Sequence, residues 1–579
     1  MSDDIVEMVR SSSLVQPHGG VLKELYVSSD LAAELRPGSR ALPHIVLDHR
    51  HLCDLELLLN GAFSPLDGFM QEADYREVVD RMRMSDGLLW PMPVNLDVSE
   101  AIAAPLSVGD DVVLRDTQGT ALAVLNVSDM FRPDKQREAQ NIYGTQDPCH
   151  PGVADLLSRG GVYLGGRLRG LQPPAHQDFT DLRLSPGALR AWFDHQGWHR
   201  IVAFQTRNPM HRAHVELTRR AMDAVDGRLL LHPAVGRTKD GDIDAHTRVR
   251  CYRALLSHYP KDAVKLSVLP LAMRMAGPRE AVWHALIRKN HGVSHFIVGR
   301  DHAGPGVDAS GKPFYGALQA QVLLDDYKDE LGIKVLAFPP MVYSPVRSAF
   351  VPSDKLTPGE VVSDVSGTQL RGHLRQGTPL PEWFTYPEVA RVLRQRYPPA
   401  SRRGCAIFFT GLSGAGKSAM AQVLMAHLLE HTGRQVSMLD GDEVRRTLSA
   451  GLGFSRADRS ANVLRIAYVA AEVVRHGGVA ICAPIAPYAD DRARARAMVE
   501  EHGDFIEVHV NTSLAVCEGR DTKGLYAQAR SGVLKNFTGI SDPYEIPANP
   551  DLVLDGSEGT PVELAAQIIA EMKRRSLID

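Results

Sequence analysis

The 579-residue sequence lacks an excess of charge of either sign, closely paired cysteines and a long apolar run. Lys and Arg total 65 against 69 Asp and Glu, so no strong basic field is present to hold nucleic acid. The six cysteines include no CxxC pair, which argues against a zinc cluster and a disulfide-stapled secreted scaffold. No apolar run approaches the ~18 residues of a membrane span, and no apolar targeting segment opens the sequence. We therefore expect a cytoplasmic protein without a membrane or nucleic-acid partner.

What is present is typical of an ordinary folded chain. Hydrophobic residues make up 44% and charged residues 23% of the sequence. At ~100 to 200 residues per domain, the length predicts roughly three to five domains. Because the formal net charge is only −4, an anionic ligand has to be held by local groups rather than by a broad field.

The pattern of apolar runs changes along the chain. Residues 1 to about 170 contain short apolar runs broken by Gly, Pro and Asp, with a hairpin turn at residues 116–119, and are predicted to be β-rich. From about residue 200, buried strands alternate with helices; the expected strands are 200–204, 228–235, 264–270, 295–299 and 334–338. This alternation predicts a parallel, doubly wound sheet whose ligands bind beyond the carboxyl ends of its strands.

Three further segments complete the chain. Residues 341–396 form a small segment that ends in a helical stretch. Residues 397–403 contain two prolines and are typical of an interdomain linker. A second α/β unit is predicted for residues 404–579, where an apolar strand comes first.

A phosphate-binding loop follows that strand. Residues 411–418 match the pattern GxxxxGK[ST] and precede a helical run. Such glycines let backbone N–H groups surround phosphate oxygens, while Lys417 adds a cation for the β- and γ-phosphates and Ser418 can ligate Mg²⁺. We predict an ATP site that uses Mg²⁺ and is formed by Gly411, Ser413, Gly414, Ala415, Gly416, Lys417 and Ser418.

A helix start with two histidines follows the first strand of the parallel sheet. Asn208 is a good N-cap and Pro209 suits the first helical position, so His211 and His214 are expected to share one face of the first turns. The HExxH pattern of a zinc protease is missing, which favours imidazole N–H groups directed at a pyrophosphate over a zinc site. Solvent-exposed histidines without a ligand remain the alternative. The preceding loop offers two groups for a second anion, Gln205 and Arg207.

Several motifs extend this site over the first two thirds of the chain. QTRNPMHRAH, LLHPAVGRTKDGDI, FIVGRDHAGPG and SGTQLRGHLRQGTPLPEWFTYPEV occur in the order in which ATP sulfurylase (sulfate adenylyltransferase) has them, and NGAFSPLDGFM and YGTQDPCHPGV extend the match towards the N-terminus. Residues 1–396 therefore resemble that family. The resemblance implies a PUA-like domain at 1–170, a Rossmann-like nucleotidyltransferase domain at 171–340 and a small α/β segment at 341–396 that completes the enzyme.

The resemblance also implies a reaction and its residues. Sulfate attacks the α-phosphorus of ATP and pyrophosphate leaves, so no general base is needed and the positioning of two anions is the main task. Gln205 and Arg207 would hold sulfate with the backbone of Ala303, and His211 and His214 would stabilise the pyrophosphate. The other implied contacts with nucleotide or sulfate are Arg300, His302, Thr206, Asn208, Ser366, Thr368 and, beside the adenine, Val342.

Residues 404–579 resemble adenylylsulfate (APS) kinase. LDGDEVRRTLSAGLGFSRADRSANVLR, DTKGLYAQARSG and NFTGISDPYEIP carry this resemblance. It implies a P-loop kinase fold that phosphorylates the ribose 3′-hydroxyl of adenylylsulfate, with Lys417 at the phosphates and Asp442 taking the proton. The positions carried over for adenylylsulfate binding are Asp440, Arg445, Phe454, Arg459, Asn462, Ile485, Lys523 and Phe537.

The whole chain is thus similar to a fused bifunctional ATP sulfurylase and APS kinase, with ATP, sulfate, adenylylsulfate and pyrophosphate as small-molecule partners. Resemblance to the fused family favours a homo-oligomer, either a dimer or a hexamer. The sulfurylase reaction can also run in reverse and make ATP. Glu443, Leu464 and Ala486 differ from the usual kinase pattern, so a weak or regulatory nucleotide-binding module is the alternative for the last third.

Overall fold

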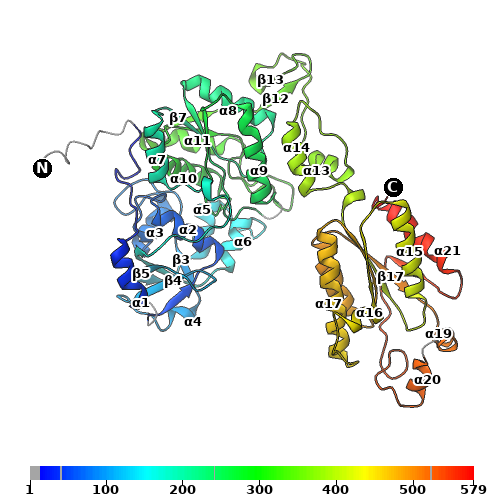
Figure 1. The fold of residues 1–579 in the computed structure, drawn as a ribbon. Helices are drawn as coiled ribbons and strands as arrows, with labels where there is room; N and C mark the ends of the chain where they lie inside the picture. Colours follow the sequence, from blue (N-terminus) through cyan, green and yellow to red (C-terminus); the bar gives the residue numbers. More distant parts are fainter. Residues whose placement is uncertain (1–13, 39–41, 240–241, 522–523, 579) are drawn as a thin grey trace. The chain divides into compact units, whose positions relative to one another are not determined.

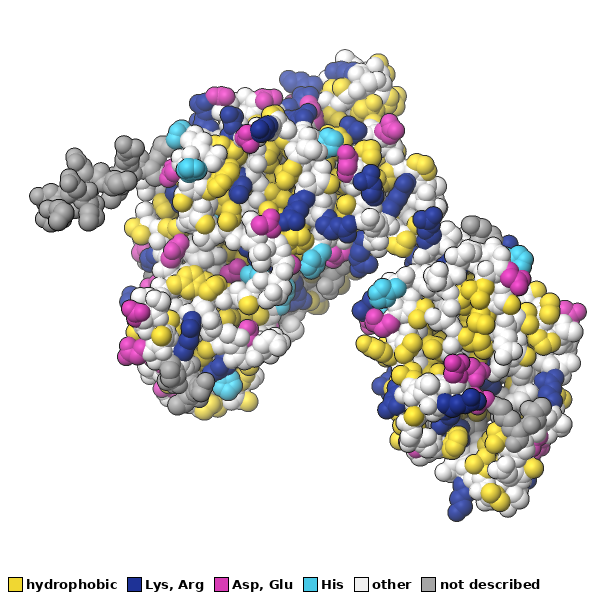
Figure 2. Space-filling model, in the orientation of Figure 1, with side chains coloured by type: hydrophobic (Ala, Val, Ile, Leu, Met, Phe, Trp, Pro, Cys, Tyr) yellow, Lys and Arg dark blue, Asp and Glu magenta, His cyan; other side chains and the backbone are white. Residues whose placement is uncertain are grey.

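The computed structural model describes residues 14–38, 42–239, 242–521 and 524–578 (Figure 1). The chain folds into two compact units. The first unit contains the chain up to Val365 together with Pro381–Leu393, and the second contains Ser366–Leu380 together with the chain from Arg394 onward. On the face shown in Figure 2, basic and acidic side chains are interspersed with uncharged ones, as expected for a net charge of −4.

The N-terminal part of the first unit is built on a six-stranded sheet, as its β-rich sequence predicts. Its order is β1-β4-β5-β6-β2, with β3 also paired to β6, and only β1 and β4 run parallel. The strands are β1 (His44–Val46), β2 (Gly68–Phe69), β3 (Leu96–Val98), β4 (Asp111–Arg115), β5 (Ala121–Phe131) and β6 (Val162–Gly170). The predicted hairpin is confirmed, because β4 and β5 are antiparallel and flank residues 116–120. The helices here are α1 (Ser29–Gly38), α2 (His49–Leu59), α3 (Glu72–Arg81), α4 (Glu100–Ala103), α5 (Lys135–Tyr143) and α6 (Pro151–Ser158).

The second half of the first unit contains the predicted parallel sheet. All five strands are parallel in the order β11-β10-β7-β8-β9. They are β7 (Ile201–Phe204), β8 (Arg228–Leu231), β9 (Val264–Leu266), β10 (His295–Val298) and β11 (Lys334–Ala337). The helices are α7 (Pro186–His195), α8 (Arg212–Val225), α9 (Ala245–Leu255), α10 (Gly277–Asn290), α11 (Gln319–Asp326) and α12 (Lys328–Leu331). Chain order reverses between β7 and β10, which is the switch point where doubly wound sheets bind ligands.

One hydrophobic core joins the two halves of the first unit. It includes Trp90 from the N-terminal half and Trp283 from α10, both fully buried. The ring of Phe63, also from the N-terminal half, contacts Trp283, with ring centroids 4.9 Å apart. Because aromatic side chains of this size dominate core energetics, the β-rich half supports the parallel sheet as part of one packed body.

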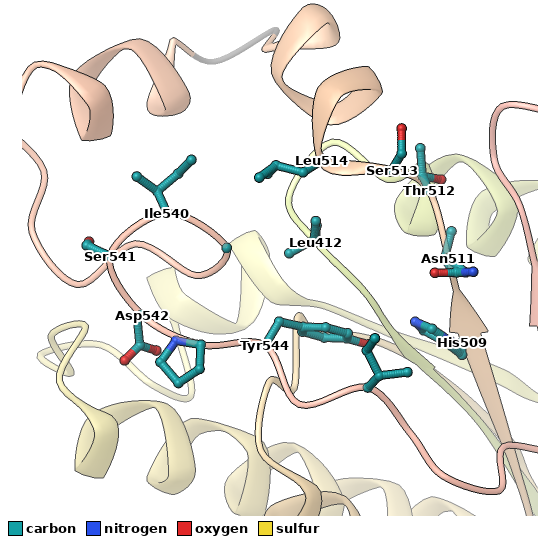
Figure 3. A pocket seen from close by; sticks show the side chains of 14 residues that line it. Leu412, His509, Asn511, Thr512, Ser513, Leu514, Ile540, Ser541, Asp542 and Tyr544 are labelled. Atoms are coloured by element: carbon teal, nitrogen blue, oxygen red, sulfur yellow. The ribbon is translucent and has the colours of Figure 1, made fainter.

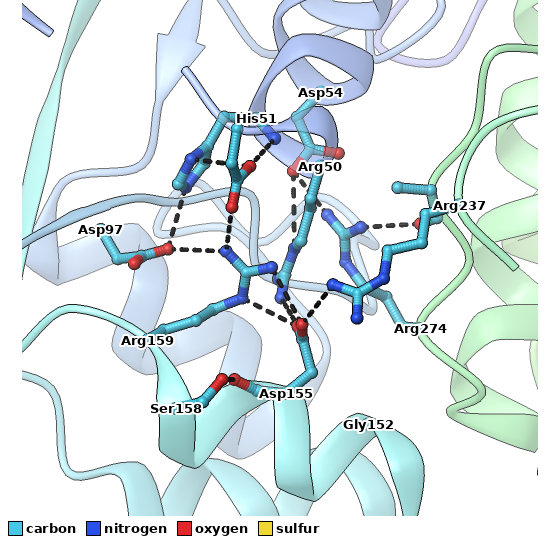
Figure 4. Close-up of polar contacts among 12 residues, drawn as sticks. Arg50, His51, Asp54, Asp97, Gly152, Asp155, Ser158, Arg159, Arg237 and Arg274 are labelled. Atoms are coloured by element: carbon cyan, nitrogen blue, oxygen red, sulfur yellow. Dashed lines mark hydrogen bonds and ion pairs between the residues drawn. The ribbon is translucent and has the colours of Figure 1, made fainter. Parts of the chain in front are cut away.

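A network of ion pairs connects the same two halves (Figure 4). Asp155 on α6 accepts hydrogen bonds from Arg50 on α2 at 2.6 Å, from Arg159 at 2.8 Å and from Arg237 at 2.8 Å. Arg237 belongs to the loop after β8, and Arg274 before α10 pairs with the fully buried Asp54. The network therefore ties the N-terminal half to two loops of the parallel sheet.

A β-hairpin and a separate segment complete the first unit. β12 (Met341–Ser344) pairs antiparallel with β13 (Ala349–Pro352), and β12 packs against α8. Within Pro381–Leu393, the ring of Trp383 stacks on Tyr343 with centroids 5.0 Å apart. The small segment predicted at 341–396 is thus shared, because Ser366–Leu380, which holds α13 (Gly367–Gln376), groups with the second unit.

The second unit is a five-stranded parallel sheet covered on both faces (Figure 1). Its order is β15 (Val436–Asp440), β16 (Val479–Ala483), β14 (Cys405–Thr410), β17 (Asp504–Val510) and β18 (Leu552–Leu554). Alternate residues of β14 enter two separate cores, one shared with α15 (Lys417–His431) and α21 (Pro561–Arg574), the other with α17 (Arg456–Arg475) and α18 (Ala489–Glu500). The other helices of this unit are α16 (Gly441–Arg446), α19 (Leu514–Arg520) and α20 (Leu525–Arg530), whereas α14 (Pro387–Arg396) begins in the first unit and ends in the second.

The stretch predicted as a linker is partly ordered against this unit. Residues 400–402 form a short 3₁₀ helix, and the guanidinium of Arg434 donates hydrogen bonds to the carbonyls of Ser401 and Arg403. Among the described residues of both units, no helix is long and apolar enough to cross a bilayer.

Candidate active sites

The residues predicted to bind sulfate and nucleotide converge at the switch point of the first unit. β7 leads directly into Gln205, Thr206 and Arg207, and the adjacent β10 leads into residues 299–303. Because β7 and β10 are parallel neighbours, both loops leave the same edge of the sheet. The fold therefore brings together two of the predicted sequence motifs, which lie about a hundred residues apart in the sequence.

Arg207 is held from several sides. Its Nη1 pairs with the carboxylate of Asp242 at 2.8 Å, and its Nη2 donates to the carbonyl of Gly304 at 3.0 Å. Its own carbonyl accepts a hydrogen bond from Arg248 at 3.0 Å. A Cβ on Gly304 would lie 1.9 Å from Oδ1 of Asp301, so a larger residue here would require the Asp301 side chain to move. The sequence pattern indicated Arg207 but assigned no role to Asp242, whose partner is 35 residues away.

Behind Gln205 lies a buried set of polar side chains that the sequence did not indicate. His284 on α10 is fully buried; its Nε2 lies 3.4 Å from the Gln205 amide nitrogen and 3.3 Å from Glu280. Its Nδ1 lies 3.0 Å from Nε2 of His302. One imidazole thus contacts two predicted site residues, and a carboxylate orients that imidazole.

Glu280 stays ionised in this environment. Burial opposes its charged form, but hydrogen bonds from His284 and from the backbone N–H groups of Arg274 and Ala276 outweigh burial and lower its pKa. An ionised Glu280 accepts a hydrogen bond from the Nε2–H group of His284. Nδ1 of His284 is then free of a proton and accepts a hydrogen bond from His302.

The start of α8 differs from the prediction. His211, and not Asn208, is the N-cap residue, and α8 begins at Arg212, so Pro209 does not occupy the first helical position. The backbone of Asn208 bonds other groups instead. Its N–H donates to the Thr206 hydroxyl, and its carbonyl accepts from the hydroxyls of Thr206 and, at 2.7 Å, Tyr252. Contacts with α9 thus override the local capping preference.

His211 and His214 lie close together at the start of α8, with ring centroids 6.2 Å apart, and a hydrogen bond joins them. The backbone N–H of His211 donates to Nδ1 of His214 at 3.1 Å. Because a backbone N–H can only donate, Nδ1 of His214 is an acceptor and the neutral ring carries its proton on Nε2. Burial lowers the pKa of His211 to about 3 and that of His214 to about 4, so both rings are neutral near pH 7.

The other predicted contacts of the first unit are distributed around this edge. Ala303 is buried and has a left-handed backbone (φ 55°), with its carbonyl accepting from the N–H of Gly277. Arg300 is exposed in the same loop, and Val342 lies on β12, the strand that packs against α8.

The predicted anion site at Ser366 and Thr368 belongs to the second unit instead of the first. Ser366 is the N-cap of α13, and its hydroxyl accepts from the N–H of Gln369 at 3.2 Å. The side chain of Thr368 lies outside the described part of the structure. The role of both residues remains a prediction.

In the second unit, the glycine-rich loop joins β14 to α15 as predicted. Gly411, Gly414 and Gly416 have φ values of 150°, 76° and 108°, in the region that favours glycine. The Lys417 ammonium donates to the carbonyls of Gly411 at 2.9 Å and Leu412 at 2.7 Å. The loop therefore has the shape of a phosphate cradle, with its lysine held against the loop backbone.

Beside the cradle lies a pair of oxygen ligands. The Ser418 hydroxyl donates to Oδ2 of Asp440 at 2.7 Å, and Oδ1 of Asp440 caps α16 by accepting from the N–H of Asp442. The sequence placed Asp440 among the adenylylsulfate contacts, whereas the structure places its carboxylate beside the predicted magnesium ligand. Asp442 is exposed on the first turn of α16.

The predicted acceptor-binding side chains form one cluster. The guanidinium of Arg445 lies over the ring of Phe454 at 4.5 Å, and Arg459 donates to the carbonyl of Phe454 at 2.9 Å. Arg459 also donates to the Thr538 hydroxyl and to the carbonyl of Asn536, on either side of Phe537. Burial and the nearby Arg459 lower the pKa of Arg445, as expected where two cations face one another.

Three further predicted positions border this cluster. Asn462 on α17 is buried with its Oδ1 unpartnered among the described residues. The carbonyl of Ile485 accepts from the N–H of Gly411 at 3.2 Å, so the turn after β16 touches the cradle. Lys523 lies outside the described residues.

The positions that differ from the usual kinase pattern do not disturb these contacts. Glu443 is exposed in the first turn of α16, where a carboxylate is favourable, and Leu464 is half-buried on α17. Ala486 is buried with φ 45°, and its carbonyl accepts from Arg492 at 2.8 Å.

A pocket of about 530 Å³ opens at the carboxyl end of β17 (Figure 3). Its lining includes His509, Asn511 and Tyr544, together with Leu412 of the cradle and Ile540, three residues beyond Phe537. The pocket therefore lies between the cradle and the segment that carries Phe537.

Comparison with known proteins matches a family to each of three parts of the chain. Models of three families match: PUA-like domain at residues 15–173, ATP-sulfurylase at 180–396 and adenylylsulphate kinase at 403–555. A sulfate adenylyltransferase of Gibberella zeae is 50% identical over 569 residues, which covers 97% of this chain and 99% of that protein. One from Neurospora crassa is 49% identical with the same coverage.

A solved structure is also similar over nearly the full length. The hexameric APS kinase from Thiobacillus denitrificans superposes with a TM-score of 0.79 and 34% sequence identity. The match covers 98% of this chain and 100% of that one. The similarity to these proteins therefore extends over nearly the whole chain and is not confined to one of its parts.

Proposed function

Because the chain belongs to the sulfate adenylyltransferase family and carries an adenylylsulphate kinase domain, we propose that it activates sulfate in two steps. The first unit, termed the sulfurylase unit, converts ATP and sulfate to adenylylsulfate and pyrophosphate. The second, termed the kinase unit, transfers the γ-phosphoryl group of another ATP to the 3′-hydroxyl of adenylylsulfate. The products are 3′-phosphoadenylylsulfate and ADP.

In the first step, a sulfate oxygen attacks the α-phosphorus of ATP and the bond to the β-phosphate oxygen breaks. Gln205 and Arg207 hold the sulfate, because they follow β7 at the switch point and Arg207 is fixed by Asp242 and Gly304. Thr206, Asn208, Arg300, His302 and Ala303 are the accompanying contacts. Sulfate is already ionised, so this step depends on positioning and charge stabilisation.

His211 and His214 act on the leaving pyrophosphate as neutral donors. The contact that fixes the His214 proton on Nε2 leaves that N–H to bond a phosphate oxygen. Donors that are in place before reaction stabilise charge as it develops, at no cost in reorganisation.

In the second step, the ribose 3′-hydroxyl oxygen bonds the γ-phosphorus of ATP, and the bond from that phosphorus to the ADP oxygen breaks. Asp442 takes the proton of the 3′-hydroxyl. Residues 411–418 surround the phosphates of ATP, and Lys417 moves from the loop carbonyls to the phosphate oxygens. Phe454, with Arg445 and Arg459 beside it, offers a stacking face and cations for adenylylsulfate, and Asn462, Ile485 and Phe537 border it.

Mg²⁺ accompanies the nucleotide in the kinase unit. Ser418 and Asp440 fit this ion because a hydroxyl and a carboxylate oxygen stand 2.7 Å apart at the start of α15, and Mg²⁺ prefers such oxygen ligands. Bound with ATP, the ion offsets charge on the β- and γ-phosphate oxygens.

The domain limits 1–170, 171–340, 341–396, 397–403 and 404–579 remain proposals. The family matches at 15–173 and 403–555 support the first and last of them, and the match at 180–396 spans the second and third together. A homo-oligomer is supported by the name of the solved relative, which is called hexameric. The sulfurylase reaction is reversible, and the same residues serve synthesis of ATP from adenylylsulfate and pyrophosphate.

The capping contact between His211 and His214 is the observation that carries the sulfurylase proposal, and its test is His214→Ala. We expect molybdate-dependent release of pyrophosphate to fall about a hundredfold or more. His195→Ala, which removes an exposed histidine at the end of α7, serves as the matched control and is expected to keep full activity. An unchanged rate in His214→Ala would refute the assigned role.

The kinase proposal is tested with ATP and adenylylsulfate as substrates. Formation of 3′-phosphoadenylylsulfate by the purified full-length chain is expected, and Lys417→Ala is expected to abolish it while leaving pyrophosphate release unchanged. No product above the Lys417→Ala background would instead favour a regulatory nucleotide-binding module.

A further inference from the structure

The segment Pro381–Leu393 lies against the start of α8 in the sulfurylase unit. The carbonyl of Phe384 accepts the backbone N–H of Arg212 at 3.1 Å. The ring centroids of Phe384 and His211 lie 4.2 Å apart. The guanidinium carbon of Arg212 lies 4.0 Å from the centroid of the Tyr386 ring. The segment therefore fixes the helix terminus that carries the two histidines, although it is about 170 residues away in the sequence.

Between these two aromatic residues, Thr385 contacts His211 directly. The Thr385 hydroxyl oxygen lies 2.9 Å from Nδ1 of His211. Thr385 is 3% and His211 is 7% exposed. Both groups are thus shielded from water, and their hydrogen bond needs a defined donor and acceptor.

The direction of this hydrogen bond follows from the partners available. In the described part of the chain, His211 is the only hydrogen-bond partner of the Thr385 hydroxyl. If Nδ1 of His211 donated, the hydroxyl proton would be left buried without an acceptor, which costs about 1 to 3 kcal/mol. The hydroxyl therefore donates to Nδ1, and the neutral ring of His211 carries its proton on Nε2.

We propose that Thr385 is a positioning residue that holds His211 in the Nε2–H form, so that His211 and His214 present the same ring atom to the leaving pyrophosphate. This inference rests on the proposed function of the two histidines. Two different devices give the same result: a backbone N–H sets the His214 ring, and a side-chain hydroxyl from a distant segment sets the His211 ring. The opposite form would direct a lone pair of Nε2 at a phosphate oxygen.

The first test removes only the hydroxyl. Thr385→Val has nearly the same volume as threonine and is expected to lower kcat of the sulfurylase reaction about tenfold to a hundredfold. Thr385→Ser keeps the donor and is expected to stay within about threefold of the wild type. Kinase activity of both variants is expected to be unchanged, which checks that the full chain is folded.

A double substitution separates action through His211 from a structural effect. In the His211→Ala background, Thr385→Val is expected to cause no further loss, because its target is gone. A loss of the same factor in both backgrounds would overturn the proposal. If His211→Ala itself kept full activity, the assigned pyrophosphate contact would fail, and this inference with it.

A second comparison leaves Thr385 intact and so does not depend on folding of the valine variant. Glutamine places its amide near Nε2 of a histidine, whereas asparagine places it near Nδ1. His211→Gln is therefore expected to retain at least tenfold more activity than His211→Asn. Equal activity of the two, or a more active asparagine variant, would show that the Nε2 proton is not the group that matters.

Discussion

Acidification is expected to destabilise the sulfurylase unit before the kinase unit. Burial disfavours the charged form of several histidines in the sulfurylase unit, and for five of them it lowers the pKa to about 3 or 4. The values are about 4 for His18, His150 and His214 and about 3 for His211 and His291. In the kinase unit, His509 is the one buried histidine among the described residues.

The sign and size of the effect follow from proton linkage. A histidine in the unfolded chain takes up a proton near pH 6.5, whereas these five stay neutral in the folded state until about pH 4. Their contribution to the stability of the folded unit is therefore fully present above pH 6.5 and is lost as the pH falls towards 4. At pH 5.5 each of these five loses about 1.4 kcal/mol of its contribution to stability, which sums to about 7 kcal/mol. His51, whose pKa is raised by Asp48 and Asp97 against the effect of burial, offsets part of this loss.

Differential scanning calorimetry of the full chain at pH 7.5, 6.5 and 5.5 tests this prediction. For a unit of roughly 380 residues, a loss of about 7 kcal/mol corresponds to a fall in Tm of about 9 °C. Ile407→Ala opens a cavity in the core beside β14 and lowers the Tm of the kinase unit only. This variant therefore identifies which calorimetric transition belongs to the kinase unit. The reasoning would be refuted if the sulfurylase transition shifted no more than the kinase transition between pH 7.5 and 5.5.

Three substitutions test other contacts. Asp155→Ala removes the carboxylate that three arginines share and is expected to lower the free energy of unfolding of the sulfurylase unit by about 3 to 5 kcal/mol in urea titration. The control Glu100→Ala, in an exposed ion pair, is expected to cost about 1 kcal/mol or less. Glu280→Gln is expected to raise the KM for sulfate about tenfold, because the ring beside Gln205 loses its orientation. Asp440→Ala is expected to lower kinase kcat about a hundredfold and leave sulfurylase kcat unchanged, and a normal kinase rate at low Mg²⁺ would contradict its assignment.

The strands and the cradle of this chain could be predicted because their signals are local. A strand buried on both faces, such as Cys405–Thr410, reads as a continuous apolar run, and the glycines after it are needed for a loop with positive φ. Parallel order then follows from alternation with helices, and the order places Gln205 and Arg207 beside residues 299–303.

The start of α8 could not be predicted, because its reason is not local. Asn208 and Pro209 are the residues that propensity favours for a helix start. The loop carbonyls are instead held by Arg248 and Tyr252 on α9, and the first turn is capped by His214. No residue within the loop carries that information.

The groups that orient the site were missed for the same reason. Asp242 is 35 residues from Arg207, and Thr385 is 174 residues from His211. Both belong to motifs that carry the family resemblance, but a motif alone does not tell which side chain binds substrate and which holds another side chain. Glu280 and His284 lie in a stretch that the sequence pattern indicates only as a helix.

In the proposed function, the two active sites hold similar anions with different kinds of donor. The kinase cradle uses a charged ammonium, Lys417, together with backbone N–H groups. In the proposed sulfurylase site the donors are neutral histidines, and Arg207 is already paired with Asp242. A strong net positive charge would bind ATP, sulfate and pyrophosphate alike, and such uniform binding does not raise kcat. Neutral donors of fixed orientation interact most with charge that develops on the departing pyrophosphate, so they favour the transition state while allowing the product to leave.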